Sequence, residues 1–310
     1  MSLLISIPQS MQPSSLCSEL LSLDPNLEII EGHANVKNSK NIEFAVVWSS
    51  FPEGFFLNYP NLKAICTYGH GADLLLEDKK LPKEVPIVRL KDSTMAASMS
   101  EYLLAVVLFN KRQLLNHATN PDFVEWGISS RKKGNHVSIL GLGYLGQAAA
   151  KAFLKMGFEV SGWSRTQKEF ENMSSFSGKG GLTKMLQNSD YLINLLPLTQ
   201  ETSDLLNRIT LSKLKRGAYF INVGRGKTLV ENDLIHLLET GHLSGACLDV
   251  FRKEPLAKEH PFRNHKKIII TPHNSSSTPA TSVAPQILEN YRRAISGRTL
   301  LNLVDLNHGY

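Results

Sequence analysis

Four side chains in the second half of the sequence have the types that proton transfer and anion binding require. Arg225 follows the apolar segment FINV, Asp249 and Glu254 lie in CLDVFRKEPL, and His273 follows IIITP. Ligands of open parallel sheets bind beyond the carboxyl ends of the strands. We therefore expect these four side chains to converge at one edge of a sheet, although they are far apart in the sequence.

Together these side chains have the chemistry to reduce a 2-oxo acid. The planar guanidinium of Arg225 suits a carboxylate and polarises a neighbouring ketone. A histidine such as His273 can protonate the ketone oxygen as hydride arrives, and a carboxylate such as Glu254 favours the protonated imidazole. Each residue alone also fits a simpler role, a surface ion pair for the arginine or a structural position for the histidine. The hypothesis depends on the whole set.

Three glycines stand at the spacing of a dinucleotide-binding turn. Gly141, Gly143 and Gly146 follow the apolar segment HVSIL and open the alanine-rich segment QAAAKAF. In such a turn the first glycine permits a tight bend, the second lets the backbone approach a pyrophosphate, and the third allows close helix packing. N–H groups at the helix start then bind the phosphates. A turn kept only for packing leaves this spacing unexplained, so we predict a bound dinucleotide.

The residues after the next apolar segment predict which dinucleotide is bound. FEVSGW ends in Ser164, Arg165 and Thr166, and the nearest acid, Glu159, stands at the start of that segment. An acid at the end of this strand binds the ribose of NAD, whereas an arginine accommodates the 2′-phosphate of NADP. Arg165 also fits an ordinary surface position. We predict NADPH as the cofactor, with NAD less favoured, and expect Arg165 and Ser164 on the 2′-phosphate.

The elements that must position these residues alternate along the chain. Apolar segments expected to be strands precede residue 91 (LLISI, LEII, FAVVW, LKAIC, PIVRL) and recur from residue 136 (VSIL, FEVSGW, YLINLL, AYFINV, GACLDV, KIIIT). Helix-like segments lie between them, so we predict an α/β fold with parallel sheets. A chain of 310 residues suits two domains with a cleft between them. Helices are expected from 93 to about 117, joining the domains, and from 281 to 296, crossing back to the first.

Composition argues against several classes of function. Apolar residues make up 42% of the chain and charged residues 20%, as in ordinary globular proteins. The longest apolar run, residues 103–109, is far shorter than the roughly 20 residues of a membrane span. We expect no membrane partner, and the apolar start MSLLISIPQS is expected to be a strand rather than a secretory signal.

Charge and cysteine content limit the partners further. The net charge of +6 comes from 34 basic and 28 acidic residues in scattered groups. No basic face with interleaved aromatic residues is evident, so we expect no nucleic-acid partner and favour an anionic small molecule. Three widely spaced cysteines, Cys17, Cys66 and Cys247, fit neither a disulfide framework nor a metal site. We expect a cytoplasmic protein without a metal.

The motifs also carry a family resemblance. GLGYLG, INLLPLTQET, INVGRG, LDVFRKEPL and TPHNSS, in this order, resemble the D-isomer-specific 2-hydroxyacid dehydrogenases over about residues 137 to 280, with weaker support in YGHGAD. Within the family, WSRT and LINLLPLT are most similar to the glyoxylate/hydroxypyruvate reductases. The resemblance implies NADPH-dependent reduction of glyoxylate or hydroxypyruvate to 2-hydroxy acids. It also implies two Rossmann-like domains, a flavodoxin-like substrate domain and a doubly wound dinucleotide-binding domain.

The resemblance assigns roles to individual positions. Arg225, Glu254 and His273 are implied as catalytic, and Asp249 as the group that holds the nicotinamide carboxamide. The substrate-binding residues implied are Trp48, His70, Gly71 and Arg225. The cofactor-binding residues expected are Gly141, Gly143, Tyr144, Leu145, Gly146, Ser164, Arg165, Thr166, Leu196, Pro197, Thr202, Val223, Gly224 and Asp249.

His70 departs from the family pattern, which has a small residue at this place in YGHGAD. The preferred 2-oxo acid therefore stays open. So does the core or pocket position of Trp48, since a tryptophan that ends a strand suits both.

The resemblance further implies domains of residues 1–100 plus 282–310 and 101–281, and a homodimer formed largely through the nucleotide-binding domains. Two alternatives remain. The chain can be another member of the family, acting on lactate or phosphoglycerate, or a dinucleotide-sensing protein of the corepressor kind that keeps the fold and works by binding partners. A turnover assay separates the enzymes from the binding protein.

Overall fold

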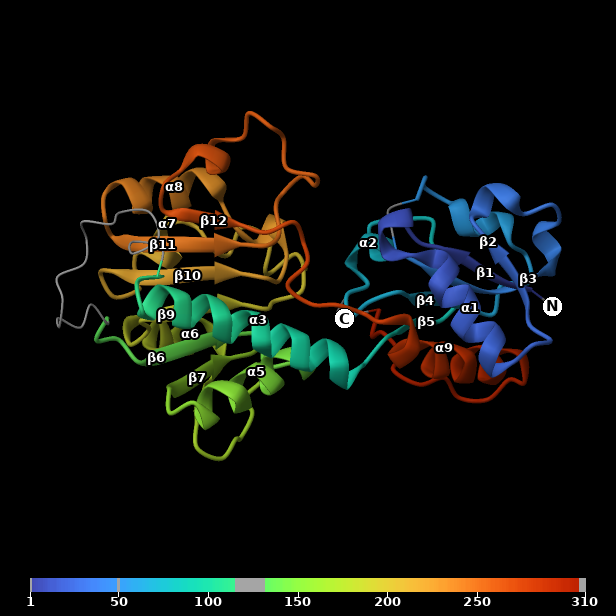
Figure 1. The fold of residues 1–310 in the computed structure, drawn as a ribbon, viewed down its shortest axis with the longest axis horizontal. Coiled ribbons are helices and arrows are strands. Elements are labelled where there is room, and N and C mark those ends of the chain that lie inside the picture. The colour runs from blue at the N-terminus through green and yellow to red at the C-terminus, as the bar shows by residue number, and fades with distance from the viewer. Residues whose placement is uncertain (1, 49–50, 115–131, 307–310) are drawn as a thin grey trace. The chain divides into compact units, whose positions relative to one another are not determined.

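The computed structural model describes residues 2–48, 51–114 and 132–306. The chain divides into two compact units, Met1–Met95 with Thr278–Tyr310, and Ala96–Ser277 (Figure 1). We call them the first and second unit. The predicted domains, residues 1–100 with 282–310 and residues 101–281, stay a prediction.

The first unit contains a five-stranded parallel sheet with the order β2-β1-β3-β4-β5. This is the flavodoxin-like strand order that the resemblance implied. Its strands are β1 (Ser2–Ser6), β2 (Glu28–Glu31), β3 (Ile42–Val47), β4 (Ala64–Thr67) and β5 (Ile87–Arg89). Its helices are α1 (Pro13–Leu23), α2 (Asp73–Leu76) and α9 (Ala280–Ile295).

Alternating residues of β1 face two separate cores in this unit. Leu3 and Ile5 pack in the core that also contains residues of α1 and α9. Leu4 packs in the core on the other face, together with Phe56. Helix α9 ends before Gly297, whose φ of +68° suits the left-handed position that closes a helix. The last helix therefore packs in the first unit although it follows the second in the sequence.

The second unit contains a seven-stranded parallel sheet with the order β12-β11-β10-β9-β6-β7-β8. The strand order reverses between β6 and β9, as in doubly wound nucleotide-binding sheets. Its strands are β6 (His136–Leu140), β7 (Glu159–Trp163), β8 (Ser174–Phe176), β9 (Tyr191–Asn194), β10 (Ala218–Asn222), β11 (Leu243–Leu248) and β12 (Ile268–Ile270). Its α-helices include α5 (Tyr144–Lys155), α6 (Gly178–Gln187), α7 (Arg208–Leu211) and α8 (Glu231–Glu239).

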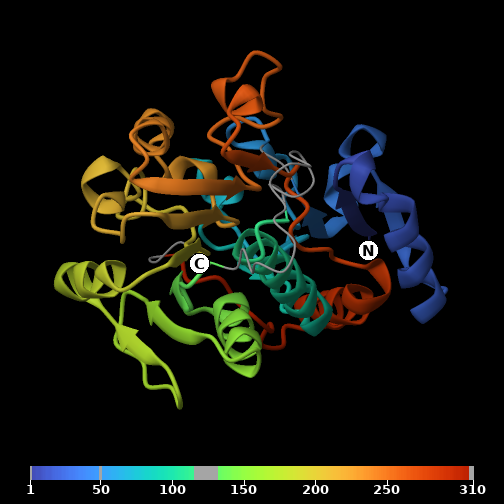
Figure 2. The same ribbon diagram turned by 60° about the vertical axis from the view of Figure 1, so that its left-hand side comes forward.

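Helices cover both faces of the second sheet (Figures 1 and 2). Helices α3 (Ser93–Lys111) and α5 pack on one face, where Val107 and Phe153 join the core. Helices α6 and α8 pack on the other, where Leu186 and Leu238 are buried. The predicted α/β fold with two parallel, Rossmann-like sheets is therefore confirmed.

Two elements differ from the sequence-based expectation. Helix α3 ends at Lys111 rather than near residue 117, because Gln113 takes a left-handed φ of +55° that breaks the helix. Residues 115–117 of the expected helix lie outside the described residues. The sequence also missed β8, a short edge strand without an apolar run.

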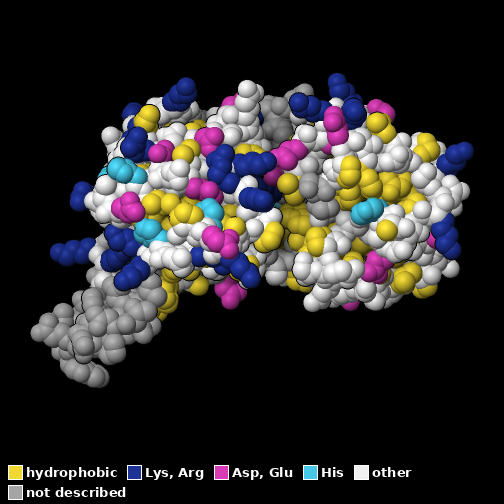
Figure 3. Space-filling model, turned by 90° about the horizontal axis from the view of Figure 1, so that it is seen from above, with side chains coloured by type: hydrophobic (Ala, Val, Ile, Leu, Met, Phe, Trp, Pro, Cys, Tyr) yellow, Lys and Arg dark blue, Asp and Glu magenta, His cyan; other side chains and the backbone are white. Residues whose placement is uncertain are grey.

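No helix within the described residues is long and apolar enough to cross a membrane. In the view of Figure 3, Lys and Arg side chains are distributed among acidic and uncharged ones, as expected for a solvated surface. Cys17, Cys66 and Cys247 form no disulfide. The described residues contain no cluster of histidine, cysteine and acidic side chains suited to a metal ion.

Candidate active site and cofactor site

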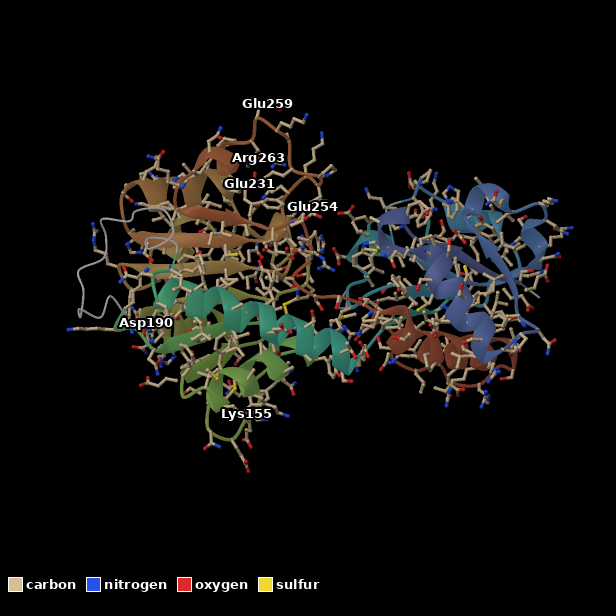
Figure 4. All side chains as sticks on the ribbon, in the orientation of Figure 1. Lys155, Asp190, Glu231, Glu254, Glu259 and Arg263 are labelled. Carbon is tan, nitrogen blue, oxygen red and sulfur yellow. The ribbon has the colours of Figure 1, made fainter. Side chains whose placement is uncertain are left out.

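The predicted polar residues lie at one edge of the seven-stranded sheet. Arg225 follows β10, Asp249 follows β11, and His273 follows β12. These three strands are parallel neighbours, so their carboxyl ends share one edge. Figure 4 shows Glu254 at this edge and Asp190 at the opposite one. The sheet therefore brings together residues that the sequence separates.

Glu254 and His273 form a hydrogen-bonded pair. The Nδ1 atom of His273 donates to Oε2 of Glu254 at 2.7 Å. The other carboxylate oxygen accepts the backbone N–H of Phe251 at 2.9 Å. Burial opposes ionisation of Glu254, but the hydrogen bond and charge of His273, the Phe251 N–H and the charge of Arg225 outweigh it and lower the pKa of the carboxyl below its ordinary value. The pair keeps 39% and 35% of its side-chain surfaces exposed, so solvent can reach it.

The loop that carries Glu254 is held by two further side chains, labelled in Figure 4. Arg263 donates to the carbonyls of Leu256 and Ala257 at 2.7 and 2.8 Å. Glu231, at the start of α8, accepts the backbone N–H of Arg252 at 3.4 Å. Glu254 is thus carried by a loop that is fixed on both sides.

Arg225 is positioned by a buried polar network that the sequence analysis missed. The side-chain amide of Asn194 donates to Oδ1 of Asn222 and to Oγ1 of Thr228, both at 2.9 Å. Thr228 in turn donates to the backbone carbonyl of Arg225 at 2.6 Å. The only signal in the sequence was the asparagine that ends each of the apolar segments YLIN and FIN. The network fixes the backbone of Arg225 by joining β9 to β10.

Close backbone packing surrounds Arg225. A Cβ at Gly224 would lie 2.8 Å from the carbonyl oxygen of Leu196, and one at Gly226 would lie 1.9 Å from the carbonyl carbon of Phe251. The guanidinium of Arg225 donates to the Gly224 carbonyl at 2.8 Å. Side chains at either glycine would displace the loop that carries Arg225.

Asp249 is fully buried and organises the loop that carries His273. Its Oδ1 atom accepts the hydroxyl of Thr271 at 2.5 Å and the N–H of Asn274 at 2.9 Å, and its Oδ2 atom accepts the N–H of Ser275 at 3.0 Å. A carboxylate offers about four acceptor sites, so three are occupied. The resemblance assigned Asp249 to the nicotinamide carboxamide, and the structure gives it this internal task as well.

The glycine turn has the geometry that a pyrophosphate needs. Gly141 has a φ of +100°, and a Cβ there would lie 2.8 Å from the carbonyl oxygen of Leu195. A Cβ at Gly146 would lie 1.9 Å from the carbonyl oxygen of Gly141, so only glycine allows α5 to approach the turn. At Gly143 a Cβ would meet none of the described atoms within 4 Å, and no side chain caps the start of α5. The turn therefore fits a dinucleotide phosphate.

The end of β7 carries the residues predicted for the 2′-phosphate. Arg165 and Thr166 are exposed, whereas Ser164 is buried and its hydroxyl donates to the carbonyl of Thr166 at 2.9 Å. A cation that the sequence analysis overlooked lies nearby: Lys168 donates to the carbonyl of Leu142, inside the glycine turn, at 2.8 Å. This corner of the sheet therefore has two positive charges and an exposed hydroxyl.

The remaining predicted cofactor residues lie around the glycine turn and beyond β9 and β10. Thr202 donates to the carbonyl of Pro197 at 2.6 Å and so shapes the loop after β9. The others are Tyr144 and Leu145 at the start of α5, Leu196 after β9 and Val223 after β10.

The predicted substrate residues Trp48, His70 and Gly71 belong to the first unit, where they follow β3 and β4. A Cβ at Gly69 would lie 2.3 Å from Cζ3 of Trp48, so the indole packs on the loop that carries His70. The Nδ1 atom of His70 lies 3.3 Å from the carbonyl oxygen of Leu90 and can donate to it. Convergence of these residues with Arg225 in a cleft stays a prediction.

A doubly wound sheet with a glycine turn at its switch point and an imidazole–carboxylate pair at its carboxyl edge defines an NAD(P)-binding dehydrogenase. The chain belongs to the D-isomer specific 2-hydroxyacid dehydrogenases, because the NAD-binding domain of that family matches residues 109–275, more than half of the chain. The predicted family and enzyme class are thereby confirmed.

Individual relatives are similar along nearly the whole chain. A glyoxylate/hydroxypyruvate reductase A from Photorhabdus laumondii is 36% identical over 293 residues, which cover 92% of this chain and 93% of the relative. A D-isomer specific 2-hydroxyacid dehydrogenase from Xanthobacter autotrophicus Py2, solved with NADPH and MES, is 36% identical with a TM-score of 0.92, covering 100% of this chain and 99% of that one. An NADPH-dependent glyoxylate/hydroxypyruvate reductase from Sinorhizobium meliloti, solved with NADP and sulfate, is 33% identical with a TM-score of 0.91, covering 100% of both chains. The predicted similarity to glyoxylate/hydroxypyruvate reductase A is confirmed.

Proposed function

We propose that this protein reduces small 2-oxo acids to 2-hydroxy acids with NADPH, and that glyoxylate and hydroxypyruvate are its preferred substrates. The observation that carries the proposal is the 2.7 Å pair of His273 and Glu254, next to Arg225 at the carboxyl edge of the nucleotide-binding sheet. Relatives named glyoxylate/hydroxypyruvate reductase A support the choice of substrates.

The chain's own residues divide the chemistry between binding and proton transfer. When bound, the reduced nicotinamide supplies a hydride to the carbonyl carbon. Arg225 binds the substrate carboxylate and polarises the ketone. Because Nδ1 of His273 donates to Glu254, its Nε2 atom is the one that delivers a proton to the ketone oxygen. The Glu254 carboxylate stabilises the imidazolium until that transfer. Asp249 is proposed to hold the nicotinamide carboxamide through its remaining acceptor site.

The proposed preference for NADPH rests on the end of β7. Arg165 and Lys168 bring two positive charges to this corner, and the loop from Ser164 to Lys168 contains no acid. The 2′-phosphate of NADPH would form charge-assisted hydrogen bonds with these cations. The ribose hydroxyls of NAD would find no carboxylate in this loop to accept their hydrogen bonds. NADP and NADPH in the structural relatives are consistent with this preference.

Initial rates of NADPH and NADH oxidation with glyoxylate, hydroxypyruvate, pyruvate and phenylpyruvate test the proposal. We expect turnover of glyoxylate and hydroxypyruvate with NADPH, and a lower kcat/KM with NADH. NADPH binding without turnover of any acid would favour the dinucleotide-sensing alternative. Turnover of lactate or phosphoglycerate with NAD would favour the other enzyme alternatives.

Two further properties are proposed on the family resemblance and the composition. We infer a homodimer formed largely through the second unit, which sedimentation at micromolar concentration can test. We also infer a cytoplasmic location, supported by three cysteines that form no disulfide.

A further inference from the structure

A chain of side chains runs from helix α3 to the loop of His273. The hydroxyl of Tyr102, on α3, lies 2.7 Å from Oγ1 of Thr271, which follows β12. The same hydroxyl lies 3.3 Å from the Sγ atom of Cys247, on β11. Thr271 in turn contacts Oδ1 of Asp249 at 2.5 Å. All four residues belong to the second unit.

The direction of these hydrogen bonds follows from their last member. The Asp249 carboxylate can only accept hydrogen bonds, so the hydroxyl of Thr271 must donate its single proton to it. Thr271 can then only accept from Tyr102, and Tyr102 can only accept from the thiol of Cys247. Burial raises the pKa of Tyr102 and raises that of Cys247 to about 11, so both keep their protons at neutral pH. Each residue therefore donates to the next, from Cys247 through Tyr102 and Thr271 to Asp249, and we call these four residues the relay.

The end of this relay fixes the backbone around His273. Asp249 accepts the N–H groups of Asn274 and Ser275, and its own carbonyl accepts the N–H of His273 at 2.9 Å. These contacts hold His273 at a left-handed φ of +53°, which costs a non-glycine residue free energy. The same loop makes a second contact with α3: the N–H of Ser277 donates to the hydroxyl of Ser98 at 3.3 Å.

We propose that Tyr102 is a positioning residue for His273. Its hydroxyl orients Thr271, Thr271 orients the Asp249 carboxylate, and Asp249 holds the strained loop that directs His273 at Glu254. Tyr102 thereby links helix α3 to the position of His273. The role of His273 as proton donor rests on the proposed function, whereas the restraint on the loop does not.

The test compares Tyr102→Phe, Thr271→Val and the double variant with Thr271→Ser, which keeps the hydroxyl. Loss of one buried hydrogen bond should lower kcat about three- to tenfold for Tyr102→Phe and for Thr271→Val. The KM for the 2-oxo acid should change less than twofold, since Arg225 is untouched. Thr271→Ser should keep most of the activity. Tyr219→Phe, which alters a buried tyrosine of β10 outside the relay, is the control and should leave kcat unchanged.

Two results separate positioning from ordinary packing. In a Thr271→Val background, Tyr102→Phe should have less than a twofold further effect on kcat, because both variants break the same relay. Amide hydrogen exchange of a peptide spanning residues 271–277 should become faster in Tyr102→Phe and not in Tyr219→Phe. Additive effects, an unchanged kcat or unchanged exchange would each overturn the proposal. If the wild type reduces no 2-oxo acid, the proposed function fails, and the exchange experiment alone decides whether Tyr102 restrains the loop.

Discussion

Glu254 accepts hydrogen bonds from both an imidazole and a backbone N–H, and this arrangement ties its charge to the protonation of His273. The pKa of the Glu254 carboxyl is lowered, so the group stays ionised as pH falls toward its ordinary value of 4.5. The carboxylate therefore supports the imidazolium at neutral pH, and this support is lost only in acid, when pH falls through the lowered pKa.

Glu254→Gln keeps the size and hydrogen-bonding capacity of the side chain but removes its charge. The imidazolium loses its carboxylate partner, so the alkaline limb of the pH profile for 2-oxo acid reduction should move to lower pH, with much of the rate recovered in acid. The profile is measured with saturating cofactor at each pH. Glu259→Gln, at the tip of the same loop (Figure 4), is the matched control and should leave the limb in place. A limb that does not move in Glu254→Gln would remove Glu254 from this role.

Arg165→Asp tests the proposed 2′-phosphate site. A charge-assisted contact contributes about 1.5 to 3 kcal/mol, or roughly ten- to a hundredfold in affinity. NADPH binding should therefore weaken by about this factor, while NADH binds equally well or better. Lys155→Asp makes the same charge change at the far end of α5 and serves as the control for overall electrostatics. If both variants shift the NADPH to NADH ratio equally, Arg165 acts only through long-range charge.

His70→Ala tests the departure of this chain from the family pattern. If His70 lines the proposed substrate site, removing its imidazole should enlarge that site, so kcat/KM for phenylpyruvate should rise relative to that for glyoxylate. A tenfold change in this ratio corresponds to about 1.4 kcal/mol, well within what one side chain can contribute. An equal loss with both substrates would instead show that His70 binds the carboxylate or supports the loop through its contact with Leu90.

At the scale of elements, Asp190 joins three segments at the amino edge of the second sheet. Its carboxylate accepts the N–H groups of Asn135 and His136 at 3.0 and 2.9 Å and pairs with Lys215 at 3.0 Å. Burial alone would raise the pKa of Asp190, but these donors bring it below the ordinary value of 3.8. The stabilisation is therefore present at neutral pH and lost as pH falls through this lowered pKa.

Asp190→Asn should lower the free energy of unfolding by about 1.5 to 3 kcal/mol at neutral pH, the range for lost hydrogen bonds to a charged group. The difference between wild type and variant should shrink as pH falls below the ordinary value of 3.8, because the unfolded wild type is then protonated and the folded carboxylate progressively loses its charge. Urea unfolding at pH 7 and about pH 3 measures both values. Glu239→Gln, at the exposed end of α8, should change neither. A difference independent of pH would mean that packing, and not charge, carries the effect.

The elements differ in how far the sequence predicts them. The strands from β1 to β12, apart from β8, follow from apolar runs, and the glycine turn follows from its spacing, because both signals are local. The network of Asn194, Asn222 and Thr228 was missed, because its hydrogen bonds depend on which strands become neighbours in the sheet. The relay from Tyr102 to Thr271 was missed for the same reason, since its members come from α3 and β12.

At the scale of the whole molecule, the two units carry different parts of the proposed chemistry. The second unit holds the glycine turn, Arg225 and the His273–Glu254 pair, and the first unit holds Trp48 and His70. The chain passes between the units within α3, after Met95, and again after Ser277. The second passage follows His273 by only a few residues. The order of the motifs predicted this division, but the sequence offers no signal for the backbone restraints on His273.

The most direct test of the whole account is the rate of NADPH oxidation with glyoxylate and hydroxypyruvate by wild type and His273→Ala. The account predicts turnover by the wild type and a loss of about 10²- to 10⁴-fold in kcat for the variant at every pH, because general acid catalysis contributes that much. NADPH affinity should stay unchanged, and His236→Ala, on the exposed side of α8, should retain full activity. A wild type that reduces neither acid, or a His273→Ala variant that keeps its kcat, would contradict the account.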